Sequence, residues 1–149
     1  MKEKSTDELD EMLDNTKITG LGGYLKENRD YMADNEKTFY YYFKDVLEDK
    51  NIKLKDVYST AGLTESYGGK VIRMEKHSAN RDTIIKLCVA GHFSWDEINR
   101  ALKLYGFNEL YSKNSRDACI ILAVKNRVFD FASINDMLDE QGLDILYDE

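Results

Sequence analysis

Residues 64–73 bring together side chains that could read the edges of DNA bases. A glutamate carboxylate can accept a hydrogen bond from cytosine N4, and lysine or arginine can donate to guanine O6 and N7. Lys70 and Arg73 are three positions apart, so both would reach one groove from the same side of a helix. The residues expected to face the bases are Thr64, Glu65, Ser66, Tyr67, Lys70 and Arg73. For Tyr67, packing against Tyr58 or Phe43 is an equally good interpretation.

A second set of residues flanks this stretch and would contact phosphates: Lys53, Lys55, Lys76, His77 and Arg81. The whole chain has 149 residues and a formal net charge of −7, which taken alone argues against a nucleic-acid binder. The charge is unevenly distributed, because residues 50–92 hold eight Lys/Arg and four Asp/Glu. Residues 1–49 carry −6 and residues 93–149 carry −5. The basic segment therefore coincides with the residues that would need phosphate contacts.

Two short helices joined by a glycine turn are predicted to hold these residues. The first has its apolar side chains on one helical face: Leu54, Val57, Tyr58 and Ala61. Gly62 suits a turn position with positive φ, and Leu63 would point into the angle between the helices. Thr64 is predicted to be the N-cap of a second helix over about 65–76. This is the layout of a helix-turn-helix DNA reader, and the alternative is a helical hairpin that only packs.

Gly68 and Gly69 would lie inside that second helix, where two glycines cost roughly 2 kcal/mol relative to alanine. One explanation is close approach to DNA, where a side chain would clash. The other is close packing against the first helix of the pair. The sequence leaves both explanations open.

The flanking segments predict further helices, and the absence of proline suits a mostly helical chain. A helix over about 38–49 carries an apolar stripe made of Phe39, Tyr42, Phe43, Val46 and Leu47. Tyr40 and Tyr41 fall off that stripe, as ordinary surface or as contacts for the N-terminal helices or a second subunit. Ser94 and Glu97 have capping-box spacing at the start of a helix that is predicted to end at Gly106.

The C-terminal part of the chain repeats this unit. Seven residues recur 36 positions later, from Phe93, Ile98, Asn99, Leu102, Gly106, Leu110 and Tyr111 to Phe129, Ile134, Asn135, Leu138, Gly142, Leu146 and Tyr147. Arg81 and Asp82 recur 35 positions later as Arg116 and Asp117. We expect residues 112–149 to form a helix pair packed on the far side of a domain over 37–111, with an acidic outer face.

Residues 1–36 form an acidic N-terminal segment in this interpretation. Ser5 and Glu8 have capping-box spacing, which predicts a short helix over 5–15. A second short helix follows around Ile18 to Leu25, and residues 33–37 would be a linker. The start of the chain is too acidic for a signal peptide, and no apolar run approaches 18 residues, so a cytoplasmic protein is expected.

Residues for other chemistry are lacking. His77 and His92 are the only histidines, and no HExxH motif is present, so metal hydrolysis has no support. Cys88 and Cys119 lie apart in apolar runs, so both are interpreted as core residues. The glycines of Tyr67–Lys70 and of Gly20–Gly23 lack the spacing of nucleotide-binding loops. No enzyme activity, cofactor or metal is expected.

The stretch from Ile52 to about Leu104 resembles the lambda-repressor-like, Xre-type helix-turn-helix family, whose fold has five short helices. The resemblance rests on Val57, Ala61, Gly62, Leu63, Thr64, Val71 and Ile72. A bacterial subgroup is more similar still, through Tyr67, Gly68, Arg81, Asp82, Tyr105, Gly106, Phe107, Leu110, Tyr111, Arg116 and Asp117, and it also carries an acidic N-terminal segment. The resemblance implies an all-α fold with that five-helix domain, extra N-terminal helices and a C-terminal helix pair.

The function expected from these observations is that of a DNA-binding transcriptional regulator whose partner is double-stranded DNA. The alternative is a protein-binding adaptor, or a nucleic-acid mimic, on the same scaffold. Under either function, a homodimer or a protein partner would use the acidic ends or Tyr40 and Tyr41. No membrane partner is expected.

Overall fold

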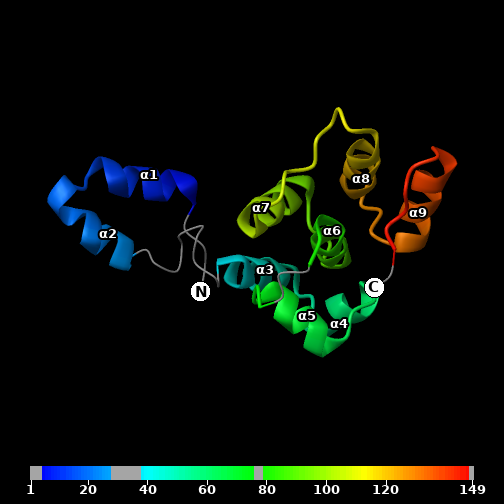
Figure 1. The fold of residues 1–149 in the computed structure, drawn as a ribbon, viewed down its shortest axis with the longest axis horizontal. Coiled ribbons are helices and arrows are strands. Elements are labelled where there is room, and N and C mark those ends of the chain that lie inside the picture. Colours follow the sequence, from blue (N-terminus) through cyan, green and yellow to red (C-terminus); the bar gives the residue numbers. More distant parts are fainter. Residues whose placement is uncertain (1–4, 28–37, 76–78, 148–149) are drawn as a thin grey trace.

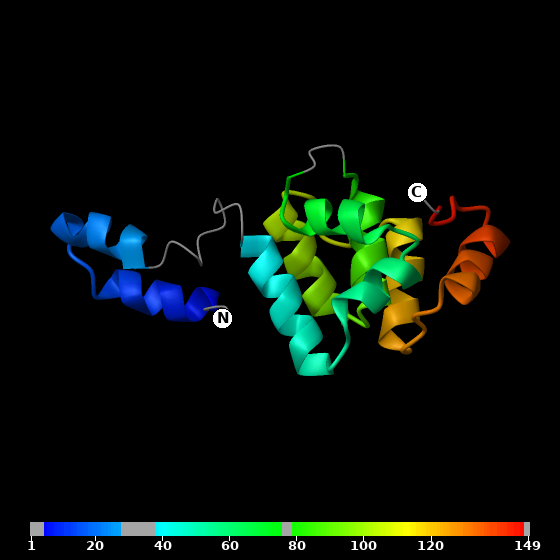
Figure 2. The same cartoon turned by 90° about the horizontal axis from the view of Figure 1, so that it is seen from below.

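The chain folds as an all-α protein in a computed structural model that describes residues 5–27, 38–75 and 79–147. These residues form nine α-helices and one 3-10 helix, and no strand is found among them. Figure 1 shows α1 (Thr6–Asp14) and α2 (Leu21–Glu27) apart from the other helices, which pack around one core, and Figure 2 shows the same separation from below. Lys76 and His77, both expected phosphate contacts, lie outside the described residues.

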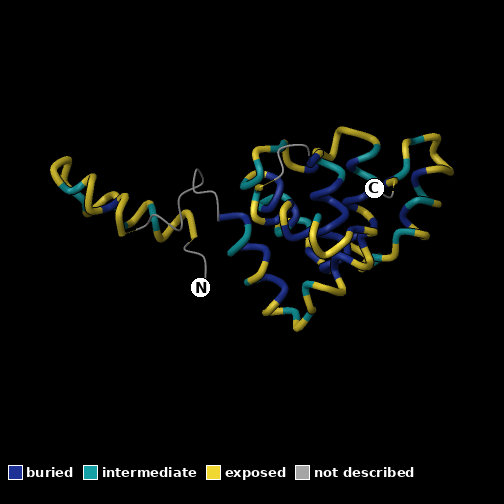
Figure 3. The backbone as a smooth tube through the Cα atoms, turned by 60° about the horizontal axis from the view of Figure 1, so that its bottom comes forward, coloured by how far each residue is buried: buried dark blue, intermediate teal, exposed yellow. Residues whose placement is uncertain are grey.

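Three helices build the centre of the core: α3 (Thr38–Lys50), α6 (Arg81–Ala90) and α7 (Trp95–Tyr105). The predicted apolar stripe of α3 is buried in full. Phe39 stacks on Phe43 and meets Tyr105 of α7 edge-on, with ring centroids 4.9 Å apart. Buried positions follow these helices in Figure 3, whereas α1 and α2 are mostly exposed.

The helix α7 has both ends as predicted. Ser94 Oγ accepts from the Glu97 backbone N–H, and the Glu97 carboxylate accepts from the Ser94 backbone N–H at 2.9 Å. This is a complete capping box. Gly106 ends the helix with φ of 90°, a left-handed conformation that glycine adopts at little cost.

The two short helices around the glycine turn are α4 (Leu54–Thr60) and α5 (Glu65–Ile72). Gly62 has φ of 78°, and Leu63 is buried, as predicted. The expected extension of α5 to residue 76 is wrong, because the chain turns at Met74, where φ is 59°. The Met74 and Glu75 amides donate to the carbonyls of Val71 and Lys70, which is a Schellman motif without glycine.

The predicted repeat is present in the structure as a second helix pair, α8 (Ser115–Lys125) and α9 (Phe131–Glu140). In each pair an asparagine on the second helix fixes the segment that follows. Asn99 Oδ1 accepts from the Leu110 amide and Asn135 Oδ1 from the Leu146 amide, both at 2.9 Å. Gly142, like Gly106, has positive φ. The two pairs are therefore copies of one unit.

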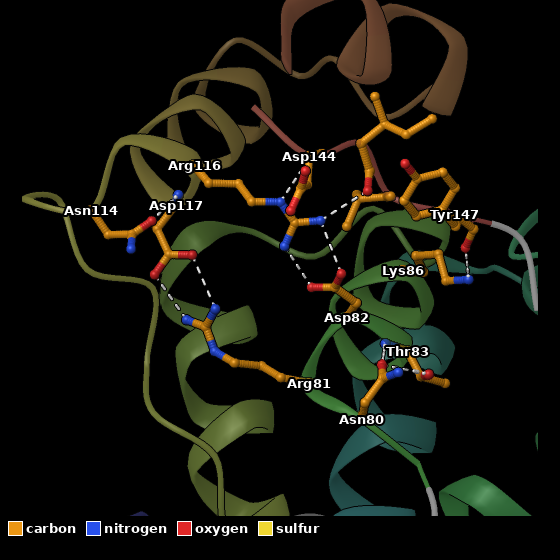
Figure 4. Close-up of polar contacts among 12 residues, drawn as sticks. Asn80, Arg81, Asp82, Thr83, Lys86, Asn114, Arg116, Asp117, Asp144 and Tyr147 are labelled. Atoms are coloured by element: carbon orange, nitrogen blue, oxygen red, sulfur yellow. Dashed lines mark hydrogen bonds and ion pairs between the residues drawn. The ribbon is translucent and has the colours of Figure 1, made fainter. Parts of the chain in front are cut away.

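The two copies are joined by crossed ion pairs (Figure 4). Arg81 of α6 donates to both carboxylate oxygens of Asp117 on α8, at 3.0 and 2.9 Å. Arg116 of α8 donates to both oxygens of Asp82 on α6, at 2.7 and 2.9 Å. Each guanidinium also binds two carbonyls of its own copy: Asn108 and Glu109 for Arg81, Asp144 and Ile145 for Arg116. The repeated Arg-Asp dipeptide thus locks the copies together.

The N-terminal helices leave apolar side chains uncovered. Ser5 caps α1 as predicted, and η1 (Ile18–Gly20) leads into α2. Tyr24 is buried, but four large apolar side chains are exposed: Leu13, Ile18, Leu21 and Leu25. The predicted linker over 33–37 lies outside the described residues. None of the helices in the described part of the chain is long and apolar enough to cross a membrane.

Candidate nucleic-acid interface

The outer face of α5 exposes five of the six side chains that were expected at the bases: Thr64, Glu65, Ser66, Lys70 and Arg73. Its inner face is buried and consists of Gly68, Gly69, Val71 and Ile72. The sixth residue, Tyr67, is half-buried and packs against the core, which agrees with the packing alternative inferred for it from the sequence. The helix thus separates a polar, accessible face from a packed one.

The hydroxyl of Thr64 has a local role. Its Oγ1 accepts a hydrogen bond from the Tyr67 backbone N–H at 3.1 Å, which satisfies one of the free amides at the start of α5. The hydroxyl proton stays available for a second contact, since a threonine oxygen can donate while it accepts. Thr64 therefore fixes the start of α5 and still presents a donor at its exposed end.

Gly68 allows α5 to lie directly on α4. A Cβ added at Gly68 would stand 2.4 Å from Cδ1 of the Tyr58 ring, far inside van der Waals contact. At Gly69 the nearest atom to such a Cβ is the flexible Arg73 guanidinium, at 3.1 Å. Of the two explanations for the glycine pair, close helix packing accounts for Gly68. Burial also raises the pKa of the Tyr58 hydroxyl to about 12, although the nearby positive charge of Arg73 acts to lower it.

Arg73 lies just beyond the last turn of α5, as its C-cap residue, and not within the helix as expected. Its Nε donates to the Glu75 carboxylate at 3.1 Å, and this hydrogen bond raises the pKa of the guanidinium. Both side chains are well exposed, at 44% and 54% of their area. Because exposed ion pairs contribute little to stability, Arg73 can exchange Glu75 for another acceptor at little cost.

Lys53 and Lys55 are exposed at the start of α4, where Lys53 is the N-cap residue. Neither has an ion-pair partner among the described residues, and the same holds for Lys70 on α5. These three lysines, together with the exposed Arg73, thus supply accessible positive charge at the α4–α5 pair.

Arg81, expected at a phosphate, has its guanidinium engaged within the chain. Its guanidinium is held by Asp117, whose side chain is only 7% exposed, and by two backbone carbonyls. Removing it from these acceptors would leave a buried carboxylate unpaired, which costs far more than a surface contact returns. Arg81 therefore joins the two copies of the repeat.

Much of the charge in the basic segment is likewise used within the chain. Lys50 pairs with Glu97 at 2.9 Å, and Lys86 is buried and donates to the Tyr147 carbonyl. Together with Arg73 and Arg81, this engages four of the eight cations counted from the sequence. The accessible positive charge is smaller than the sequence count indicates.

Tyr40 and Tyr41 are both half-buried on α3, with ring centroids 5.7 Å apart. Lys44 donates to the Tyr40 hydroxyl at 3.1 Å and lies over its ring.

Of the two cysteines interpreted as core residues, Cys88 is fully buried, and burial raises its thiol pKa well above the usual value. Cys119 is different, because it is half-buried and lines a cavity of about 370 Å³ between α8 and α9.

That cavity lies away from α5 and was not predicted from the sequence. Three of the α8 residues that line it correspond, through the repeat, to buried residues of α6 in the first copy. The repeat was therefore the sequence signal that could have located the cavity. No group of three or more His, Cys, Asp or Glu side chains in the described residues is arranged to hold a metal ion. Comparisons with known proteins find no matching family model, no matching curated protein and no matching solved structure.

Proposed function

We propose that this chain is a DNA-binding transcriptional regulator in which α4 and α5 act as a helix-turn-helix and α5 enters the major groove. The observation that carries the proposal is the two-sided character of α5. Its inner face is packed through Gly68, Val71 and Ile72, and its outer face is polar and exposed. A helix of this kind, fixed by its partner and free on one side, is what groove reading requires.

Each exposed side chain has a role in this proposal. Glu65 would accept from cytosine N4, and Lys70 or Arg73 would donate to guanine O6 and N7. Thr64 and Ser66 would add hydroxyl contacts, since serine and threonine pair with several base edges. Lys53 and Lys55 would contact phosphates beside the groove, and so would Lys76 and His77, which lie outside the described residues.

The number of lysines expected at phosphates sets the expected strength of binding. Two or three phosphate contacts from Lys53, Lys55 and Lys76 correspond to a slope of log affinity against log salt of roughly −2 to −3. Non-specific affinity should therefore be low, and the acidic segments on either side reduce it further by repulsion. Specific binding would depend on the base contacts of α5 more than on charge.

Selection of bound sequences from a random duplex pool by the full-length protein tests this proposal. A common short motif and a salt slope in the stated range would support it. Recovery of unselected sequences, or no retention of duplex even at low salt, would contradict it.

Protein binding is the second candidate function, and a separate observation favours it. The N-terminal helices expose Leu13, Ile18, Leu21 and Leu25 on a segment rich in carboxylates. An adaptor that uses this acidic, apolar surface would need no contact through α5. Its binding would be unaffected by substitution of Lys70.

A further inference from the structure

The two copies of the repeat differ in what covers their outer sides. In the first copy, Asp82 and Lys86 are one helical turn apart and both point to the second copy, toward Arg116 and the Tyr147 carbonyl. Thr83, Ile84 and Leu87 therefore point to other sides of α6. α4 packs on α6 and α3 packs on α7, and Thr83, Ile84 and Leu87 are completely buried.

The contact with α3 continues to the end of the first copy. A Cβ added at Gly91 would lie 2.8 Å from Leu47 of α3, and Phe43 of α3 meets Phe93 with ring centroids 5.0 Å apart. Tyr105 donates to the Val71 carbonyl of α5 at 2.8 Å. The groove between α6 and α7 is thus filled by the helices α3 to α5.

The equivalent groove of the second copy is open. Counting 35 positions on from Thr83, Ile84 and Leu87 gives Ala118, Cys119 and Leu122 on α8. These three residues line the cavity of about 370 Å³, with Met137 and Leu143 on the other side. Leu87 has no exposed surface, whereas Leu122 is 57% exposed. The same position of the repeat is therefore covered by other helices in the first copy and exposed in the second.

Charge indicates the kind of helix that would fit. Among the described residues, the cavity lining contains Glu140 and no Lys or Arg. α9 adds Asp136 and Asp139, again without a basic residue. The chain's own N-terminal helices fit poorly, because residues 5–27 hold six carboxylates and two lysines. A second copy of the chain, with net charge −7, is disfavoured for the same reason.

We propose that the groove between α8 and α9 is a docking site for an amphipathic helix of another protein, with large apolar side chains on one face and Lys or Arg beside them. The helix would take the place on the second copy that α3 to α5 take on the first. The proposal is independent of DNA binding, since α8 and α9, whose side chains line the groove, lie on a different part of the fold from α5 (Figure 1).

The probe is a synthetic peptide of residues 38–50 in which Asp45, Glu48 and Asp49 are each replaced by lysine. It keeps the apolar stripe of α3 and adds basic flanks, and the unaltered 38–50 peptide is the matched control. The readout is the alkylation rate of Cys119 in the full-length protein, with the fully buried Cys88 as an internal reference. We expect the basic peptide to slow alkylation at concentrations at least tenfold lower than the control peptide.

Leu122→Asp should weaken this protection at least tenfold, and since Leu122 is exposed the fold should persist. Leu13→Asp, at an exposed leucine of α1, is the matched control and should leave protection unchanged. Equal protection by both peptides, or protection that survives Leu122→Asp, would overturn the proposal. Two results without peptide would also overturn it. An alkylation rate of Cys119 that falls as the protein concentration rises would indicate that a second copy covers the groove. A faster alkylation of Cys119 in Leu25→Asp than in wild type would indicate that the chain's own N-terminal helices cover it.

Discussion

Arg81 on α6 and Asp117 on α8 form a bidentate ion pair. Arg116 and Asp82, the repeat equivalents of Arg81 and Asp117 at a spacing of 35 positions, form the reciprocal bidentate pair. The two pairs are alike in chemistry and unlike in burial. The side chain of Asp117 is 7% exposed and that of Asp82 is 35% exposed. Asp117 also accepts from the Tyr111 amide at 3.0 Å.

This difference predicts unequal costs for two equivalent substitutions. Asp117→Ala should lower the free energy of unfolding by about 3–5 kcal/mol, because it leaves the Arg81 guanidinium without its carboxylate partner and the Tyr111 amide without its acceptor. Asp82→Ala should cost about 1 kcal/mol, because water can replace the more exposed carboxylate. Chemical denaturation of both variants measures the costs. Equal losses would mean that burial does not separate the two pairs.

Neighbouring glycines in α5 give a second matched comparison. Gly68→Ala should destabilise the protein by about 1–3 kcal/mol, since the new methyl group overlaps the Tyr58 ring. Gly69→Ala meets only the movable Arg73 side chain, so it should be neutral or stabilising by up to about 1 kcal/mol through helix propensity. Thermal melts of the two variants check this prediction. A tolerated Gly68→Ala would show that α5 can move away from α4.

Glu97 predicts a pH dependence of stability. Burial acts to raise its pKa, but the Ser94 amide and Lys50 outweigh burial, and the pKa lies below the usual 4.5. A carboxylate with a lowered folded pKa stabilises the protein above its unfolded pKa, and this contribution is lost as pH falls through the folded value. Glu97→Gln should therefore cost about 1 kcal/mol at neutral pH, and this cost should shrink as the pH falls below 4.5.

The measurement is the free energy of unfolding of wild type and Glu97→Gln across that pH range. The two curves should converge as the solution becomes acidic. Curves that stay parallel would mean that the charge of Glu97 makes no net contribution to folding.

Local features of the fold were predictable from the sequence because local physics sets them. The stripe on α3 follows from helical spacing, the start of α7 from a capping box, and the turn at Gly62 from its freedom at positive φ. The early end of α5 was not predictable in this way. Its left-handed residue is Met74, and methionine carries no signal for that conformation.

The candidate site was less predictable, because it depends on contacts between distant segments. Arg81 looked like a phosphate ligand until its partner Asp117, 36 positions away, was located. The repeated Arg-Asp dipeptide was visible, but its meaning needs the crossed geometry. The groove at Leu122 also requires knowledge of which copy α3 covers.

The most direct test of α5 as the reading helix compares Lys70→Ala with Lys53→Ala on a duplex selected from a random pool. Both lysines are exposed and without an ion-pair partner among the described residues, so neither change should disturb the fold. Lys70→Ala should cost about 1–3 kcal/mol on the selected duplex and relax one base position. Lys53→Ala should weaken binding to all duplexes about equally and reduce the salt slope by about one. If both variants bind the selected duplex with unchanged affinity and sequence preference, α5 does not read DNA and the adaptor function takes its place.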